Sequence, residues 1–336
     1  MLQNEDVDVP FRQWPPSFWR RYLYGWAIVG VILLTDVTWL HLTNRSVRLA
    51  GIEAVGKALG VLISVVVAIR TVQRIPRYER ITENLRYAEV SDTSAWCALL
   101  LCFVSSTGIL SYLCVSINAP LVDSSLVRFD RGLGFDWPAI YLWVKSHPHV
   151  QQILELAYES GSWQLLAIPA ILGLSGRRED LSDFFFLLML SAILLLIAST
   201  PFPATSAFVH FKVSDLNAVS TVSDFAILRD GTMRLFDLRD IQGLVSIPSF
   251  HTMLAVIFTY SLRRIPLLLG LAIVLNATMI VSTPTQGGHY LVDVIAGLLL
   301  SALTIQSLRV VNRQRTVVPP PNFREAIECA TRESSL

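Results

Sequence analysis

The feature that most constrains this chain is a series of apolar segments, each close to the length needed to cross a lipid bilayer. A spanning helix requires about 20 apolar residues. Eight segments approach this length: 22–41, 52–69, 95–117, 162–175, 183–200, 250–262, 266–282 and 289–308. Hydrophobic residues make up 53% of the 336 residues and charged residues only 16%. The sequence therefore predicts an all-α, polytopic membrane protein with eight spans.

Two of the segments, 162–175 and 250–262, are shorter than a bilayer requires. Such a helix either lies among other helices or continues beyond the membrane. The first is preceded by the partly polar stretch HVQQILELAYESG, so we expect one continuous helix across 149–174.

The arginines of the short connections predict the orientation of the spans, because these residues favour the cytoplasmic side. With eight spans, most of them fall on one side: Arg20, Arg21, Arg70, Arg74, Arg77, Arg80, Arg86, Arg177, Arg178, Arg263, Arg264, Arg309, Arg313 and Arg315. Arg45 and Arg48 lie on the other side and are outnumbered. Both termini are therefore expected in the cytoplasm.

Two long connections, 118–161 and 201–248, lie on the opposite side. Connections of this length without a function are uncommon, so they and the adjoining helix ends are where we expect the chemistry. The net charge of +1 does not indicate a nucleic-acid partner. The sequence contains no glycine-rich phosphate loop and no cysteine–histidine metal motif.

Two histidine motifs stand at the starts of the sixth and eighth segments. The first is IPSFH, in which Ser249 and the free amides of the following helical turn favour anion binding beside His251. The second is GGHYLVD, in which His289 and Asp293 are four residues apart. On a helix this spacing predicts that the carboxylate orients the imidazole and stabilises its positive charge.

The two motifs are expected to meet, because a single span connects them and both lie at the same membrane face. One imidazole would then attack a substrate while the other protonates the leaving group. A single histidine at a helix start is more often an ordinary interfacial residue. Two histidines and an aspartate in this order favour a site, since ionisable groups in membrane segments commonly mark function.

The motifs IPSFH and GGHYLVDVIAG resemble the second and third signature motifs of the type 2 phosphatidic acid phosphatase (PAP2) superfamily. The residues of these motifs are most similar to those of the branch that includes inositol phosphorylceramide synthases. The resemblance implies a six-helix catalytic membrane domain over residues 95–311. Residues 1–94 would add a tail, two further helices and a cytoplasmic loop, and residues 312–336 would form a cytoplasmic tail.

The resemblance also implies roles for individual residues. His289 would form a phosphohistidine, Asp293 would orient it, and His251 would act as the general acid. Phosphate oxygens would be bound by Ser249 and the amide of Phe250, without a metal or a cofactor.

The sequence departs from the family pattern at two places. The first signature motif, a lysine and an Arg-Pro pair, is absent, and Thr283 stands where the third motif usually has arginine. A transferred phosphoryl group needs positive charge nearby. Arg229 is the candidate to supply it, with Arg234 and Arg239 as competitors. Each of these arginines could equally be a solvated loop residue paired with an aspartate.

The predicted function is cleavage or transfer of a lipid phosphate ester or phospholipid headgroup at the outer leaflet. Water as the acceptor would give a phosphatase and a second alcohol a headgroup transferase, and the sequence leaves both open. The expected location is a bacterial inner membrane with the site facing the periplasm. The alternative is a transporter or non-catalytic membrane scaffold, although carriers usually place such residues at the bilayer midplane. The oligomeric state is left open.

Overall fold

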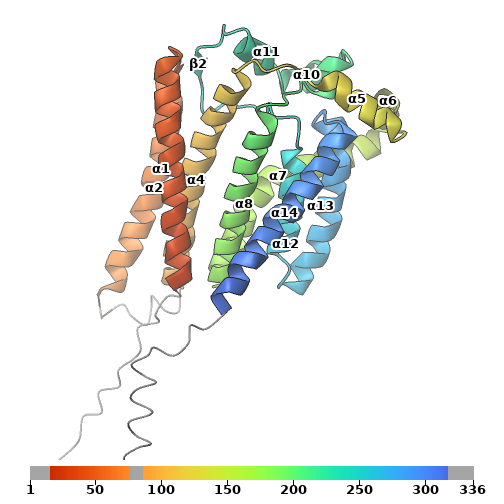
Figure 1. Cartoon of the computed structure of the whole chain (residues 1–336). Coiled ribbons are helices and arrows are strands. Elements are labelled where there is room, and N and C mark those ends of the chain that lie inside the picture. Colours follow the sequence, from red (N-terminus) through yellow and green to blue (C-terminus); the bar gives the residue numbers. More distant parts are fainter. Residues whose placement is uncertain (1–15, 76, 78–85, 317–336) are drawn as a thin grey trace, which may run out of the picture.

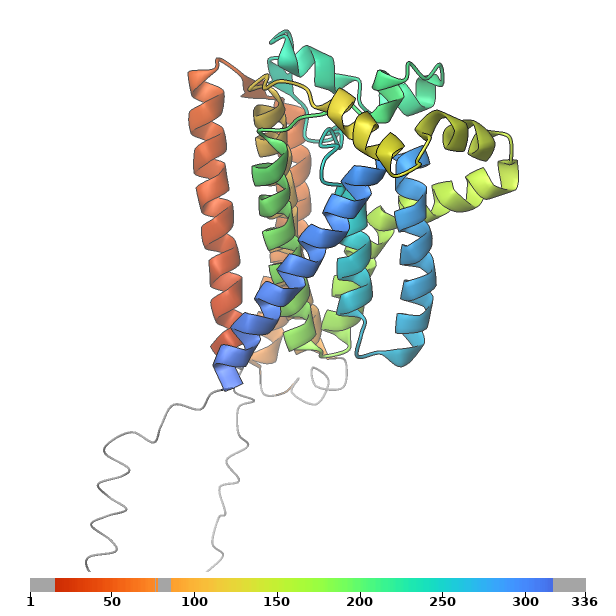
Figure 2. The same ribbon diagram turned by 45° about the vertical axis from the view of Figure 1, so that its right-hand side comes forward.

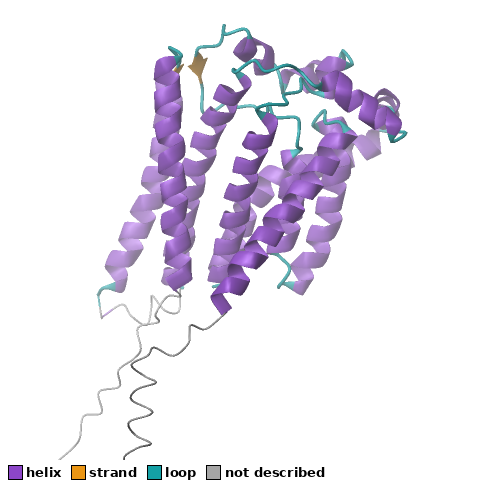
Figure 3. Ribbon diagram, viewed as in Figure 1, coloured by secondary structure: helices purple, strands orange, loops and turns teal. Residues whose placement is uncertain are grey.

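The computed structural model describes residues 16–75, 77 and 86–316, and regular structure in these ranges is almost entirely helical (Figure 3). The long helices are α1 (Pro16–Leu42), α2 (Leu49–Gln73), α4 (Tyr87–Val115), α7 (Pro148–Leu174), α8 (Arg178–Ser199), α12 (Phe250–Ser261), α13 (Pro266–Gln286) and α14 (Leu291–Thr316). They form one bundle in both views (Figure 1, Figure 2). The predicted all-α class is confirmed.

Within the described residues, six helices are long and apolar enough to cross a membrane: α1, α2, α4, α8, α13 and α14. The protein is therefore a multi-pass integral membrane protein. The other two long helices complete the bundle: α12 is apolar but has only 12 residues, and α7 has 27 residues with a partly polar first half. The continuous helix expected across 149–174 is confirmed, because α7 runs without a break through this range.

Short elements gather at one end of the bundle, the upper end in Figure 1, which we call the loop-bearing end. They are α5 (Asp123–Gly132), α6 (Trp137–Lys145), α9 (Ala207–His210), α10 (Leu216–Ser220), α11 (Asp224–Arg229) and two short parallel strands, β1 (Ser46–Val47) and β2 (Leu235–Phe236). The expected connection 201–248 and the first part of 118–161 therefore lie at this end, whereas residues 148–161 belong to the bundle helix α7. The start of α1 and the end of α14 lie at the opposite end (Figure 1).

The main hydrophobic core lies inside the bundle and includes residues of α1, α4, α7, α8, α12, α13 and α14. Its centre contains large aromatic side chains, among them Trp96, Phe185 and Phe258, which bury much apolar surface. The backbone of α1 approaches α4 closely, since a Cβ on Gly25 would lie 2.6 Å from Leu99 Cδ2. The N-terminal helix is therefore packed into the same core as the rest of the bundle.

Candidate active site

His251 and His289 come together at the ends of α12 and α14 that face the loop-bearing end. Tyr158 of α7 lies beside His251 and near Gly287. Its ring stacks on His251 with centroids 4.0 Å apart and an interplanar angle of 21°. A Cβ on Gly287 would lie 2.7 Å from the Tyr158 hydroxyl and 2.9 Å from His289 Cδ2. The two histidine motifs therefore share one site, in which Tyr158 stacks on His251 and lies close to Gly287, two residues before His289.

The imidazole of His289 is held at its Nδ1 atom. This atom lies 3.0 Å from the main-chain oxygen of Ser246 and 3.5 Å from Oδ2 of Asp293. The same Oδ2 atom accepts hydrogen bonds from the Ser246 hydroxyl (2.8 Å) and the Tyr290 amide (2.9 Å). His289 is 5% exposed and Asp293 is fully buried. The pair is thus shielded from water. Electrostatic interactions are stronger in such a buried environment than in water.

These contacts determine what His289 can do chemically. A carbonyl oxygen can only accept a hydrogen bond, so Nδ1 must carry the hydrogen and Nε2 keeps its lone pair in the neutral ring. The Asp293 carboxylate lies close enough to stabilise the cation that forms when Nε2 bonds to an electrophile. The geometry suits a nucleophilic histidine.

The expected helical arrangement of His289 and Asp293 is wrong in one respect. α14 begins at Leu291, so His289 precedes the helix and only Asp293 lies in its first turn. The two side chains still meet because the chain turns at Tyr290, whose amide donates to Asp293. His289 and Asp293 are therefore brought together by a turn that the Asp293 carboxylate stabilises, and not by their spacing along one helix.

Glycine is required on both positions before His289. Gly288 has a φ of +63°, a region that other residues rarely adopt. A Cβ there would lie 2.2 Å from Ser206 Oγ, and one on Gly287 would collide with Tyr158. The Gly288 carbonyl also accepts hydrogen bonds from the Ser206 hydroxyl (3.0 Å) and the Ala207 amide (2.8 Å). The backbone at these two glycines thus packs closely against neighbouring protein segments.

Ser249 and Phe250 lie at the N-terminus of α12, as expected from the first motif. Ser249 is the N-cap residue, and its hydroxyl accepts a hydrogen bond from the Thr252 amide at 3.4 Å. Its own amide donates to the main-chain oxygen of Asp293 at 2.9 Å. Ser249 therefore joins the two motifs, while the first amides of α12, beginning with that of Phe250, have no acceptor within the helix.

The three candidate arginines lie in different surroundings. Arg239 forms an ion pair with Asp237 at 2.6 Å. Arg234 directly precedes the strand β2, and its main-chain oxygen accepts a hydrogen bond from the Ser46 amide, between α1 and α2, at 2.9 Å. Arg229 donates from Nη2 to the Ala119 carbonyl at 2.8 Å, and its buried Nη1 has no hydrogen-bond partner in the described part of the chain. Burial lowers the pKa of Arg229, and nearby Asp123 opposes this shift.

The structure brings Arg229 towards the site only indirectly. Asp123 accepts a hydrogen bond from the Tyr290 hydroxyl at 2.8 Å, and Tyr290 follows His289 in the chain. Arg229 is therefore linked to His289 through two intervening side chains. A direct contact between Arg229 and either histidine is not observed in the described residues.

Two acidic residues of α5 belong to the site's framework and were missed by sequence reasoning. Asp123 accepts the Tyr290 hydroxyl and the Thr205 amide (3.0 Å), and Asp130 accepts the amides of Leu291 (2.9 Å) and Val292 (3.0 Å). Burial raises the pKa of Asp130, whereas the two amides lower it. The available signal was the seven-residue spacing of the two aspartates, which places them on one helix face.

Tyr158 and Ser246 were also missed. Tyr158 stands in a partly polar stretch of α7, where one aromatic residue among polar ones carries little information. Ser246 contacts His289 through its main-chain oxygen, which any residue type would offer. Among the described residues, no group of three or more His, Cys, Asp or Glu side chains could hold a metal ion.

The sequence matches the PAP2 superfamily over residues 124–306, which is just over half of the chain. The protein therefore belongs to the PAP2 superfamily. This confirms the resemblance found in the motifs at the level of the superfamily, and it supports a membrane protein of the phosphatase or phosphotransferase type. The comparisons with curated proteins and with solved structures found no match.

Proposed function

We propose that the protein is a membrane enzyme that cleaves or transfers a lipid phosphate ester through a phosphohistidine on Nε2 of His289. One observation carries the proposal: the Ser246 carbonyl binds Nδ1 of His289 and leaves Nε2 as the nucleophilic nitrogen. Membership of the PAP2 superfamily supports the same reaction class.

In the proposed reaction, Nε2 of His289 attacks the phosphorus atom and the bond to the leaving oxygen breaks. His251 donates a proton to this oxygen, which departs as an alcohol. Asp293 stabilises the positive charge on His289. Water or a second alcohol then attacks the phosphohistidine and passes its proton to His251, which restores both histidines. The stacked Tyr158 ring supports this role by keeping the His251 imidazole in position.

The phosphate oxygens are proposed to bind at the N-terminus of α12, between Ser249 and the amide of Phe250, where helix amides attract anions. Arg229 is the proposed source of positive charge, in place of the missing first motif and of the arginine replaced by Thr283. Its buried Nη1, which has no hydrogen-bond partner within residues 16–75, 77 and 86–316, supports this choice over Arg234 and Arg239.

A lipid substrate follows from the site's place at the ends of membrane helices. The narrower similarity to the inositol phosphorylceramide synthase branch favours a headgroup transferase over a phosphatase. We place the site on the periplasmic face of a bacterial inner membrane, with both termini cytoplasmic. The start of α1 and the end of α14 lie at the same end of the bundle, which supports placing both termini on one side of the membrane (Figure 1).

The division into 1–94, 95–311 and 312–336 stays a prediction. α4 begins at Tyr87, so a boundary at 95 would cut this helix, and the N-terminal part would end before it. Residues 1–15 and 317–336, which include nearly all of the proposed C-terminal tail, lie outside the described residues.

The test is turnover by the purified full-length protein in mixed micelles that contain a chelator. Phosphatidic acid, a polyprenyl diphosphate and phosphatidylinositol are offered separately, and release of phosphate or diacylglycerol is measured. We expect His289→Ala to abolish turnover and transfer of labelled phosphate to the protein, because it removes the nucleophile. His149→Ala, which changes an exposed histidine at the start of α7, is the control. Full activity of His289→Ala would refute the proposal.

A further inference from the structure

One polar group of the candidate site has no role in the reaction described above, the hydroxyl of Tyr158. The Tyr158 side chain is partly exposed, as is that of His251, on which its ring stacks. No hydrogen bond of the Tyr158 hydroxyl is observed within residues 16–75, 77 and 86–316. The hydroxyl is therefore available as a hydrogen-bond donor to a ligand.

The hydroxyl lies towards the side of His289 that carries the proposed nucleophile. A Cβ on Gly287 would be 2.7 Å from the Tyr158 hydroxyl and 2.9 Å from Cδ2 of His289. In an imidazole ring, Cδ2 is bonded to Nε2. The hydroxyl and Nε2 therefore border the same space, in which a phosphoryl group on Nε2 would lie.

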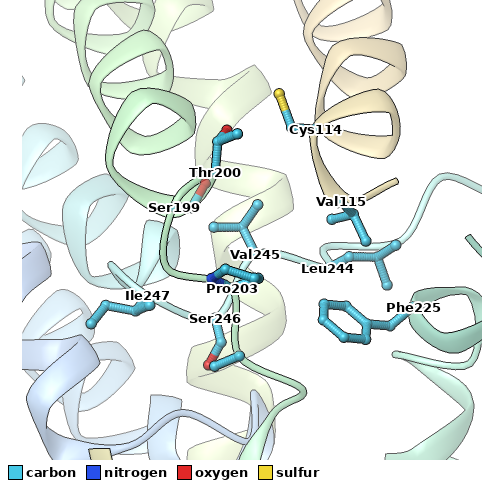
Figure 4. A pocket seen from close by; sticks show the side chains of 11 residues that line it. Cys114, Val115, Ser199, Thr200, Pro203, Phe225, Leu244, Val245, Ser246 and Ile247 are labelled. Carbon is cyan, nitrogen blue, oxygen red and sulfur yellow. The ribbon is translucent and has the colours of Figure 1, made fainter. Parts of the chain in front are cut away.

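The other nitrogen of His289 has no room for a phosphate group beside it. Nδ1 contacts the Ser246 carbonyl, and Ser246 lines a small pocket together with residues of α4, α8 and α11 (Figure 4). The volume of this pocket, about 20 Å³, fits roughly one water molecule. A phosphoryl group must therefore bind on the side of the ring that Tyr158 borders.

A donor is needed at this place because the family's basic positions are not filled. The first signature motif is absent from the sequence. Thr283, at the usual arginine position, is fully buried, and its hydroxyl donates to a carbonyl of its own helix at 2.8 Å. Arg229 is linked to His289 only through other side chains. A transferred phosphoryl group carries charge that the site must stabilise directly.

The packing of α7 holds Tyr158 in position. Gly161 lies three residues further along the same face of α7, and a Cβ there would be 3.4 Å from Cδ2 of His251. Gln164 of α7 and the buried Asn276 of α13 donate to each other's side-chain oxygen, both at 3.0 Å. A donor fixed in this way stabilises developing charge without a cost of reorganisation.

We propose that Tyr158 is a further catalytic residue, whose hydroxyl donates a hydrogen bond to an oxygen of the phosphoryl group that is transferred to Nε2 of His289. The hydroxyl keeps its proton throughout and supplies part of the stabilisation that the missing basic residues would give. This inference rests on the phosphohistidine reaction proposed above and adds a residue to it.

Tyr158→Phe is the decisive variant, because it removes the hydroxyl and retains the ring that stacks on His251. Binding of orthovanadate, an analogue of the phosphoryl group in transfer, is measured by isothermal titration calorimetry on the full-length protein in detergent. A chelator is left out because it would bind the vanadate. We expect Tyr158→Phe to weaken vanadate binding about tenfold or more, the size expected for one hydrogen bond to a charged group.

The unfolding temperature of Tyr158→Phe should equal that of the wild type, since the hydroxyl makes no hydrogen bond within the described residues. Tyr24→Phe is the matched control, because this tyrosine of α1 is 56% exposed and should not affect vanadate binding. Equal vanadate affinity of wild type and Tyr158→Phe would overturn the proposal, as would a lower unfolding temperature of this variant. The measurement needs no turnover, so it decides even where no offered lipid is the substrate.

Steady-state kinetics separates this role from positioning of His251. The phosphoryl group is common to all substrates, so Tyr158→Phe should lower kcat by a similar factor for alkyl and nitrophenyl phosphate esters. A loss confined to alkyl esters, which depend more on protonation of the leaving group, would assign Tyr158 to His251 and overturn the proposal.

The two proposals fail separately. Full activity of His289→Ala refutes the phosphohistidine reaction. Loss of activity in His289→Ala together with full activity of Tyr158→Phe refutes only the role of Tyr158.

Discussion

At the scale of single residues, the main-chain oxygen of Ser246 decides which nitrogen of His289 is free. The Ser246 hydroxyl has a different task, because it donates to Asp293 at 2.8 Å and so helps to hold the carboxylate against the imidazole. One residue thus positions both members of the pair, through its backbone and its side chain respectively. The two contributions are separable by mutation.

We predict that Ser246→Ala lowers kcat about tenfold with little change in KM, because it removes one hydrogen bond to a carboxylate and retains the backbone contact. Asp293→Asn should lower kcat by on the order of a thousandfold or more, since it removes the charge that stabilises the cation. Steady-state kinetics on the preferred lipid measures both, with exposed Ser223→Ala as the control. Equal effects of the two variants would contradict these separate roles.

At the scale of elements, α5 holds the start of α14. The first amides of a helix lack acceptors within it, and Asp130 supplies two carboxylate oxygens to the amides of Leu291 and Val292. Leu126 and Val127 are buried on the same face of α5 as Asp123 and Asp130. This short amphipathic helix therefore connects the loop-bearing end to the segment that carries His289.

We predict that Asp130→Ala destabilises the protein by about 1–3 kcal/mol, because two partly buried amides lose their acceptor. The unfolding temperature in detergent should fall, and kcat should fall with it since His289 is two residues before α14. Arg131→Ala, an exposed change on the same helix, should alter neither. An unchanged unfolding temperature in Asp130→Ala would show that α14 does not depend on this cap.

At the scale of the whole molecule, an ion-pair network joins α1 to the family-matched part of the bundle at the end opposite the loops. Asp183 of α8 forms ion pairs with Arg21 at 2.5 Å and Arg263 at 3.1 Å. Arg21 also donates to Asn312 of α14 at 2.7 Å. Arg21 and Asp183 are nearly buried. Asp183 keeps Arg263 if Arg21 is lost, whereas the loss of Asp183 leaves Arg21 without an ion-pair partner among the described residues.

We predict that Asp183→Leu lowers stability by about 3–5 kcal/mol, because it leaves Arg21 uncompensated in a buried position. The double change Arg21→Met with Asp183→Leu should recover most of this loss, since Arg263 keeps its contact with Asp180 at 3.4 Å. Thermal unfolding of wild type, both single variants and the double variant measures the coupling. Additive losses would mean that the pair does not join α1 to α8.

Much of the fold could be predicted from the sequence because each membrane helix is determined by its own stretch of sequence. Every backbone amide inside the bilayer must be bound within its own segment, so length and hydropathy are enough to locate the helices. The same locality allowed the continuous α7 to be predicted from its polar first half. The two histidine motifs were found because each is a short contiguous stretch.

The sequence by itself therefore determined the all-α membrane class, the position of most helices and the residues of the two histidine motifs. Only the tertiary structure decided how these residues act together. Ser246 is 43 residues before His289, and Asp130 is 161 residues before Leu291. Such contacts depend on how helices pack, and packing is set by the whole bundle rather than by any local pattern. For the same reason the sequence did not reveal that His289 precedes its helix.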